Sequence, residues 1–212
     1  MPGDPHATPQ YWSRAKRALA GADPVMRAII RRHPGIALRS RGDAFQTIAR
    51  SIVGQQISVK AADSVWTKLL RVAPAMRPEE LLAGRRRLRA AGLSQRKREY
   101  LLDLARRFTD GSLHPSRWDE MDDEAVIADL VQVRGIGRWT AEMFLIFNLL
   151  RPDVLPLDDL GLQRAVRLHY FAGDGGACDP EAIRGLAAGW QPWRSVATWY
   201  LWRSLDPVPV EY

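Results

Sequence analysis

Two closely spaced glycines and a pair of carboxylates are the residues of this 212-residue chain whose types and spacing suggest chemistry. Gly135-Ile136-Gly137 predicts a tight turn, because glycine adopts positive φ and lets another molecule approach the backbone closely. The amides that open the following helix are unpaired donors, and they attract a phosphate. Asp158-Asp159 then stands at the head of a later helix, where a carboxylate can stabilise positive charge or activate water. The alternative is a plain helix N-cap, worth about 1 kcal/mol.

Helices must position these residues, and the pattern of the chain predicts an all-α fold. The hairpin joins an amphipathic helix over 123–132 to a helix over about 138–149. Capping residues and prolines predict the starts of further helices, and alternating β-branched runs typical of strands are absent. The predicted helix starts lie at Tyr11, Asp23-Pro24, Asp43, Ser58, Pro78, Arg85, Ser94, Asp122, Asp179-Pro180 and Pro192.

The composition indicates a globular protein with an anionic partner. The chain is 46% hydrophobic, and its net charge of +7 favours nucleic acid, although an arginine-rich surface alone would give the same charge. The single cysteine, Cys178, excludes an internal disulfide and a cysteine-based metal or iron–sulfur site within the chain. No apolar run is long enough to span a bilayer and no signal peptide is visible, so we expect a cytoplasmic protein acting on chromosomal DNA.

Three further motifs accompany the hairpin and the acid pair: GRWTA at 137–141, LDD at 157–159 and PWRS at 192–195. Together they resemble the helix-hairpin-helix DNA glycosylase superfamily, in its 3-methyladenine DNA glycosylase II branch, from about Asp43 to Trp202. The resemblance implies a two-lobed helical fold with the active-site cleft between the lobes. One lobe would comprise about 1–41 plus 151–212 and the other about 42–150, with the hairpin at about 123–149. Residues 1–212 would form a single catalytic unit.

The resemblance also implies a reaction. The protein would be a monofunctional DNA glycosylase of base excision repair, which flips out alkylated bases such as 3-methyladenine and 7-methylguanine and hydrolyses their N-glycosidic bonds in duplex DNA. Asp159 would be the catalytic acid, and Asp158 a cap or supporting residue. Trp139 stands where branches that also cut the strand have a Schiff-base lysine. Because indole offers no amine nucleophile, we expect no lyase activity.

Trp139 and Trp202 are the residues that the resemblance places around the flipped base. An alkylated purine is cationic, so electron-rich indoles add a cation–π attraction to stacking. Met143 occupies a position where a relative has tyrosine, which suggests a wider pocket with weaker hydrogen-bond readout. In the alternative reading Trp139 packs in the core against Phe144 and Ile146, and Trp190, Trp193 and Trp199 are also core residues.

Two turns complete the expected DNA interface. In the GQxxS turn at 54–58 the resemblance makes Gln56 the wedge that fills the gap left by the flipped nucleotide, with Ile57 as the alternative and a simple helix junction as the other reading. At the hairpin it implies backbone contacts by Gly135, Gly137, Arg138 and Thr140. It also implies a structural Na⁺ or K⁺ on the carbonyls of Val131, Val133 and Ile136. No cofactor is expected, because His6, His33, His114 and His169 lack metal-site spacing.

Two other functions would account for parts of the same pattern. A glycosylase for oxidised or mismatched bases, or one with strand-cutting activity, is disfavoured by Trp139 and by the lack of iron–sulfur cysteines. A helix-hairpin-helix DNA-binding protein without catalysis would need neither Asp159 nor an aromatic pocket. The expected partner is double-stranded DNA with alkylated bases, bound by a monomer.

A run of cations predicts how binding depends on salt. Its members are Arg85, Arg86, Arg87, Arg89, Arg96, Lys97 and Arg98. If this run contacts phosphates rather than solvent alone, duplex affinity falls steeply with salt concentration, because each contact releases condensed counterions. Titrations of a labelled duplex at several salt concentrations measure the slope, and a flat dependence would contradict the contact.

Overall fold

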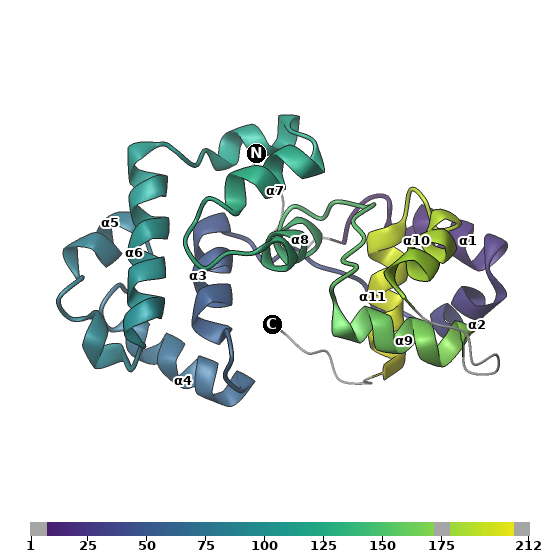
Figure 1. Ribbon diagram of the computed structural model, residues 1–212, viewed down its shortest axis with the longest axis horizontal. Helices are drawn as coiled ribbons and strands as arrows, with labels where there is room; N and C mark the ends of the chain where they lie inside the picture. Colours follow the sequence, from purple (N-terminus) through teal and green to yellow (C-terminus); the bar gives the residue numbers. More distant parts are fainter. Residues whose placement is uncertain (1–7, 172–178, 206–212) are drawn as a thin grey trace. The chain divides into compact units, whose positions relative to one another are not determined.

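The described chain is built from helices alone. The computed structural model describes residues 8–171 and 179–205, and these residues contain α-helices, two short 3₁₀ helices and no strand (Figure 1). The all-α prediction is therefore confirmed. None of the described helices is long and apolar enough to cross a membrane. His6, one of the histidines without metal-site spacing, and Cys178, the single cysteine, lie outside the described residues.

The chain divides into two compact units. Of the described residues, 8–40, 145–171 and 179–205 form unit 1, and 41–144 form unit 2. The second boundary falls inside α8 (Arg138–Phe147), so this one helix carries residues of both units.

Unit 1 is organised around its last helix. It contains α1 (Trp12–Ala22), α2 (Pro24–Arg32), α9 (Leu160–Tyr170), α10 (Pro180–Ala188) and α11 (Arg194–Leu205). Every residue of α11 from 195 to 201 is buried, and the helix contacts α1, α2 and α9. A helix that is buried all round must lie in a core. Trp199 packs edge-on against Trp12 with ring centroids 5.1 Å apart, and Trp190 is also buried, which confirms the core reading of these two tryptophans.

Unit 2 is organised around two adjacent helices. It contains α3 (Ala44–Gly54), α4 (Val59–Leu70), α5 (Pro78–Ala83), η1 (Leu88–Ala91), α6 (Gln95–Asp110), η2 (Pro115–Glu120) and α7 (Asp123–Leu130). The long α6 lies beside α3 and also packs on α5 (Figure 1). Aromatic rings continue from this layer to α8: Phe45 contacts Phe108, Phe108 contacts Trp118, and Trp118 contacts Phe144, with centroids 5.1, 6.4 and 5.2 Å apart.

Capping side chains are the feature in which the helix starts of the structure agree best with the sequence. Asp23, Asp43, Ser58, Ser94, Asp122, Asp159 and Asp179 each accept a backbone N–H in the first turn of the helix that follows. The helix predicted from residue 85 is a 3₁₀ turn that begins at Leu88, and η2 was not predicted at all. Both segments are too short to show an apolar period of 3.6. The last helix begins at Arg194 rather than at Pro192.

Asp23 ties three parts of unit 1 together. One carboxylate oxygen, Oδ1, caps α2 by accepting the amides of Val25 and Met26 at 2.8 and 3.0 Å. The other, Oδ2, accepts the Tyr170 hydroxyl at 2.7 Å and the Trp190 indole N–H at 3.0 Å. Burial, with the hydrogen bond to Asp23, raises the pKa of Tyr170 above its usual range. Asp23 is therefore both a helix cap and a half-buried hub.

Removing this hub should cost more than removing a simple cap. We expect Asp23→Ala to lower the free energy of unfolding by about 3 kcal/mol, because it leaves a buried indole N–H and a hydroxyl unsatisfied in addition to the lost cap. Asp179→Ala, which removes an exposed cap of α10, should cost about 1 kcal/mol. Urea unfolding of both variants measures the difference, and equal losses would mean that the Oδ2 contacts add nothing.

Candidate active site

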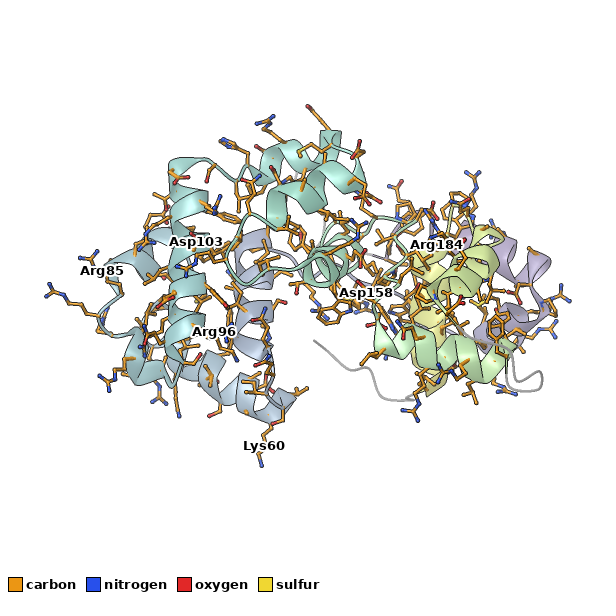
Figure 2. The ribbon with its side chains drawn as sticks, viewed as in Figure 1. Lys60, Arg85, Arg96, Asp103, Asp158 and Arg184 are labelled. Atoms are coloured by element: carbon orange, nitrogen blue, oxygen red, sulfur yellow. The ribbon has the colours of Figure 1, made fainter. Side chains whose placement is uncertain are left out.

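Asp159 is a buried carboxylate fixed by two N–H donors. It is the N-cap of α9, it is 8% exposed, and its Oδ1 accepts the Leu162 amide at 2.6 Å and the Trp202 indole N–H at 2.7 Å. Because both bonds end on one oxygen, together they fix the direction of the carboxylate. The cap and the candidate acid are thus the same residue. Asp158 is exposed (Figure 2), and its expected role as a cap is wrong because Asp159 occupies the cap position.

Close packing around Asp159 depends on a glycine. A Cβ added to Gly161 would lie 3.0 Å from Oδ1 of Asp159 and 3.1 Å from Cδ1 of Trp202. The Trp202 ring in turn stacks on Phe147, with centroids 5.7 Å apart and planes 14° from parallel. Sequence reasoning proposed Trp202 as a pocket wall but missed its bond to Asp159 and missed Phe147. The glycine two positions after the acid, in LDDLG, was the available signal.

The PWRS motif anchors the loop that leads to Asp159. The Arg194 guanidinium pairs with the Asp153 carboxylate through Nε at 2.8 Å and Nη2 at 2.9 Å. The buried Ser195 donates its amide to the Pro152 carbonyl at 3.0 Å, and its hydroxyl accepts the Val154 amide at 2.9 Å. These contacts fix residues 152–154 to the start of α11. The same helix, two turns later, carries Trp202, so α11 holds both the loop and the acid.

The two glycines of the hairpin do different jobs. Gly135 has φ +86°, and a Cβ there would lie 2.2 Å from the Tyr100 ring, so the turn needs glycine for its conformation and for its packing. Gly137 does not have positive φ, and a Cβ there would meet nothing within 4 Å. Of the two glycines, Gly135 is therefore the one whose positive φ makes the turn. The contribution of Gly137 is open space beside the first turn of α8.

Arg138 forms ion pairs with two carboxylates. Its Nη1 lies 2.9 Å from Oε2 of Glu124 and its Nε lies 3.0 Å from Oε1 of Glu142. The hydrogen bond from Arg138 lowers the pKa of Glu124. A phosphate would have to compete with both acids for this guanidinium. Any grip on a phosphate at the hairpin therefore depends on the backbone amides at the start of α8 more than on Arg138.

A cavity of about 600 Å³ in unit 2 brings the two expected DNA-contact turns together. Gln56 and Ile57 line it from the turn between α3 and α4, and Gly135, Trp139 and Thr140 line it from the hairpin side. Gln56 is exposed and has φ +58°, and Ile57 is 40% exposed. Both candidates for the wedge therefore remain available at the surface.

Trp139 and Met143 line different cavities. Trp139 is only half-buried, unlike its core neighbours Phe144 and Ile146. Met143 is 7% exposed and lines a much smaller space of about 20 Å³, which it shares with Phe144. This space is close to that of one water molecule. Met143 is therefore buried in unit 2, and its expected effect on the width of a base pocket stays a prediction.

Two residues of the basic run, Arg98 and Lys97, bind main-chain carbonyls. Arg98 is half-buried and donates from Nη1 to the Leu93 carbonyl at 3.2 Å. Arg85, Arg86, Arg87, Arg89 and Arg96 are exposed (Figure 2 labels Arg85 and Arg96). Lys97 instead donates to the carbonyls of Val53 at 2.8 Å and Gln55 at 2.7 Å. The expectation that Lys97 contacts phosphate is therefore replaced by a contact with the main chain.

The hairpin carbonyls expected to hold a monovalent cation are partly engaged. The Val133 carbonyl accepts the Ile136 amide at 3.0 Å, while Val131 is 41% exposed. Since a carbonyl has two lone pairs, this bond does not preclude a cation. Over the described ranges, no group of three or more His, Cys, Asp or Glu residues could hold a metal ion. The cation at Val131, Val133 and Ile136 stays a prediction.

Comparison with known proteins places this arrangement in a family. Residues 49–192, more than half of the chain, match the HhH-GPD superfamily of base excision DNA repair proteins. The chain belongs to this superfamily. The HhH-GPD chain is 30% identical over 206 residues to a DNA-3-methyladenine glycosylase of Bacillus subtilis, an alignment that covers 88% of this chain and 65% of the relative. It thus spans about two thirds of that relative's length.

Two solved structures have the same fold. A DNA-3-methyladenine glycosidase from Bacillus halodurans superposes with a TM-score of 0.82 at 31% identity, covering 92% of this chain and 91% of that one. The 3-methyladenine DNA glycosylase Mag1 of Schizosaccharomyces pombe, solved in complex with abasic DNA, superposes with a TM-score of 0.73 at 27% identity, covering 94% and 98%. The predicted HhH-GPD glycosylase fold is confirmed.

The hairpin glycines allow a direct test of the turn. We expect Gly135→Ala to lower the free energy of unfolding by roughly 2–3 kcal/mol, because a side chain there is both strained and in collision with Tyr100. Gly137→Ala should stay within about 0.5 kcal/mol of wild type. Denaturant unfolding of the two variants measures the contrast, and a tolerated alanine at 135 would show that the turn is set by something else.

Proposed function

We propose that this HhH-GPD protein is a monofunctional DNA glycosylase that removes alkylated bases from duplex DNA. The observation that carries the proposal is the Asp159 carboxylate, held at the start of α9 by the Leu162 amide and the Trp202 indole. Relatives named DNA-3-methyladenine glycosylases support the choice of alkylated bases. The substrate class proposed is 3-methylated adenine and 7-methylated guanine.

The reaction gives the Asp159 carboxylate two tasks. As the bond between C1′ and the base nitrogen breaks, the base leaves with the electron pair and the sugar gains oxocarbenium character. The Asp159 carboxylate stabilises that positive charge and orients the water that adds to C1′ through its oxygen, and the surplus proton of that water passes to the solvent. The products are the base and an abasic site. An alkylated purine starts cationic and leaves neutral, so it needs no proton from the protein.

Trp139 explains why the reaction stops at the abasic site. Strand cutting by this kind of enzyme requires an amine that attacks C1′ and forms a Schiff base, and an indole has none. The half-buried Trp139 instead offers a flat, electron-rich surface to a cationic base. Trp202 is a second such surface, with one face already stacked on Phe147.

We propose further that both units act on one nucleotide, as a single catalytic body. Asp159 and Trp202 belong to unit 1, whereas Trp139 and the wedge candidates Gln56 and Ile57 belong to unit 2. The hairpin, through the amides that open α8, would hold a phosphate of the same duplex. The S. pombe relative in complex with abasic DNA supports duplex DNA as the partner. The protein would bind as a monomer without a cofactor, with Na⁺ or K⁺ at the hairpin.

The test compares the two neighbouring aspartates. Asp159→Asn should lower single-turnover base release from methylated duplex by about a hundredfold or more, because it removes the charge that stabilises the sugar cation. Asparagine is as good an N-cap as aspartate, so the fold is kept. Asp158→Asn, at an exposed position, should remain near wild type. Trp202→Phe keeps a ring but loses the N–H to Asp159, and should fall between the two.

Release of bases is scored by chromatography and strand breaks by gel, without alkali. Release by the wild type, loss in Asp159→Asn and intact strands are the expected result. Duplex binding without release by the wild type would instead favour a helix-hairpin-helix DNA-binding protein without catalysis.

A further inference from the structure

The carbonyls at the C-terminal end of α3 are capped by Lys97, a residue of α6. The last carbonyls of a helix have no partner within it, and they carry partial negative charge. Lys97, in the first turn of α6, donates from Nζ to the Val53 carbonyl at 2.8 Å and to the Gln55 carbonyl at 2.7 Å. Desolvation by this packing lowers the pKa of Lys97. Its ammonium group is therefore directed at the main chain of one turn.

The Gln55 carbonyl is important because of the residue that follows. This carbonyl and the Gln56 amide belong to one planar peptide unit. Holding the carbonyl fixes the plane from which the backbone enters Gln56, whose φ of +58° is unfavourable for a residue other than glycine. Ser58 closes the other side of the turn by accepting the Ala61 amide. The turn that presents Gln56 and Ile57 is thus held at both ends.

The same face of α6 also holds the hairpin. Lys97, Tyr100 and Asp103 follow one another at three-residue spacing, which places them on one side of the helix. The Tyr100 ring lies directly against Gly135, and Asp103 accepts the Arg134 amide at 2.9 Å. Figure 2 shows Asp103 and Arg96 on this helix.

A side chain of the turn then reaches the hairpin directly. Gln55 donates its Nε2 to the Gly135 carbonyl at 2.9 Å. Since Lys97 binds the carbonyl of this same Gln55, the lysine, the turn and the hairpin form one connected chain of hydrogen bonds.

We propose that Lys97 is a positioning residue for base flipping: it holds the turn Gln55–Ile57 in the conformation that enters the duplex, in fixed register with the hairpin. The inference rests on the proposed function, because an inserted turn serves a protein that flips a nucleotide. Its physical basis is preorganisation. A turn that is already ordered does not have to be ordered during insertion, when the duplex is being unstacked.

The experiment compares Lys97→Met with Arg96→Met, a change of the exposed neighbouring cation that lines the same cavity. Two substrates carry one alkylated base each, either paired in a duplex or in a mismatched bubble where the base is already unstacked. On the paired duplex Lys97→Met should slow single-turnover release roughly tenfold, about the effect of losing one hydrogen bond to a charged group. On the bubble it should release at nearly the wild-type rate. Arg96→Met should lessen the salt dependence of binding and show no such rescue.

A double-mutant comparison asks whether Lys97 acts through the turn. On a Gln56→Ala, Ile57→Ala background, Lys97→Met should cause little further loss on the paired duplex, because the side chains it positions are gone. Equal slowing on paired and unpaired substrates would overturn the proposal. So would a salt slope reduced by about one in Lys97→Met with no change in release, which is the signature of a phosphate contact. Should Lys97→Met unfold, Lys97→Gln, which keeps an N–H donor but loses the charge, should show a smaller slowing on the paired duplex and none on the bubble.

A second readout separates this inference from the proposed function. 2-Aminopurine beside a stable abasic-site analogue reports insertion of the turn by its fluorescence, without any bond being cleaved. At equal occupancy, Lys97→Met should show a smaller fluorescence change than wild type and Arg96→Met. If the wild type binds DNA and releases no base, the proposed function fails, and this fluorescence comparison still decides whether Lys97 positions the turn.

Discussion

The hydrogen bond from the Leu162 amide to Asp159 is the contact on which the candidate chemistry depends. It places a carboxylate at the positive end of the α9 dipole. Because the bond is made inside the first turn of the helix, the direction of the acid follows the direction of α9. The acid therefore moves only if the helix moves. A residue in a loop would offer the same charge with far less control over its position.

The rest of unit 1 keeps α9 in place. α11 packs on α9 and is buried from residue 195 to 201, and it supplies the second donor to Asp159 from Trp202. Its first turn anchors the preceding loop through Ser195, and Gly161 leaves room for the indole beside the carboxylate. The Asp23 hub secures the far end of α9 through Tyr170. The packing of α11 in the core of unit 1 therefore fixes the position of Oδ1 of Asp159.

Much of this arrangement could be predicted from the sequence, and the failures have physical causes. Helix starts were found because a cap is a local property, encoded by one residue and its next three neighbours. The hairpin and Asp159 were found because their motif is also local. The bond between Trp202 and Asp159 joins residues 43 positions apart, so no window of sequence contains it. The role of Lys97 was mistaken for a similar reason: its neighbours are all cations, but its partners are carbonyls at the end of α3.

The fate of the charges in unit 2 shows why counting cations overstates contact with DNA. Arg50 pairs with Asp63, Arg134 with Glu99, and Arg138 with Glu124 and Glu142. The Lys97 ammonium binds main-chain carbonyls.

These ion pairs lie around the hairpin and the turn Gln55–Ile57, where the duplex is expected, so the charges of the side chains there are largely balanced. In the proposed function, the backbone amides of α8 would then be the main attraction for phosphate at the hairpin, since amides bind phosphate by geometry rather than by net charge. The exposed arginines at 85–89 can supply the long-range attraction. In this proposal the exposed arginines attract the duplex from a distance and the amides of α8 bind its phosphate, so the two tasks fall to different parts of unit 2.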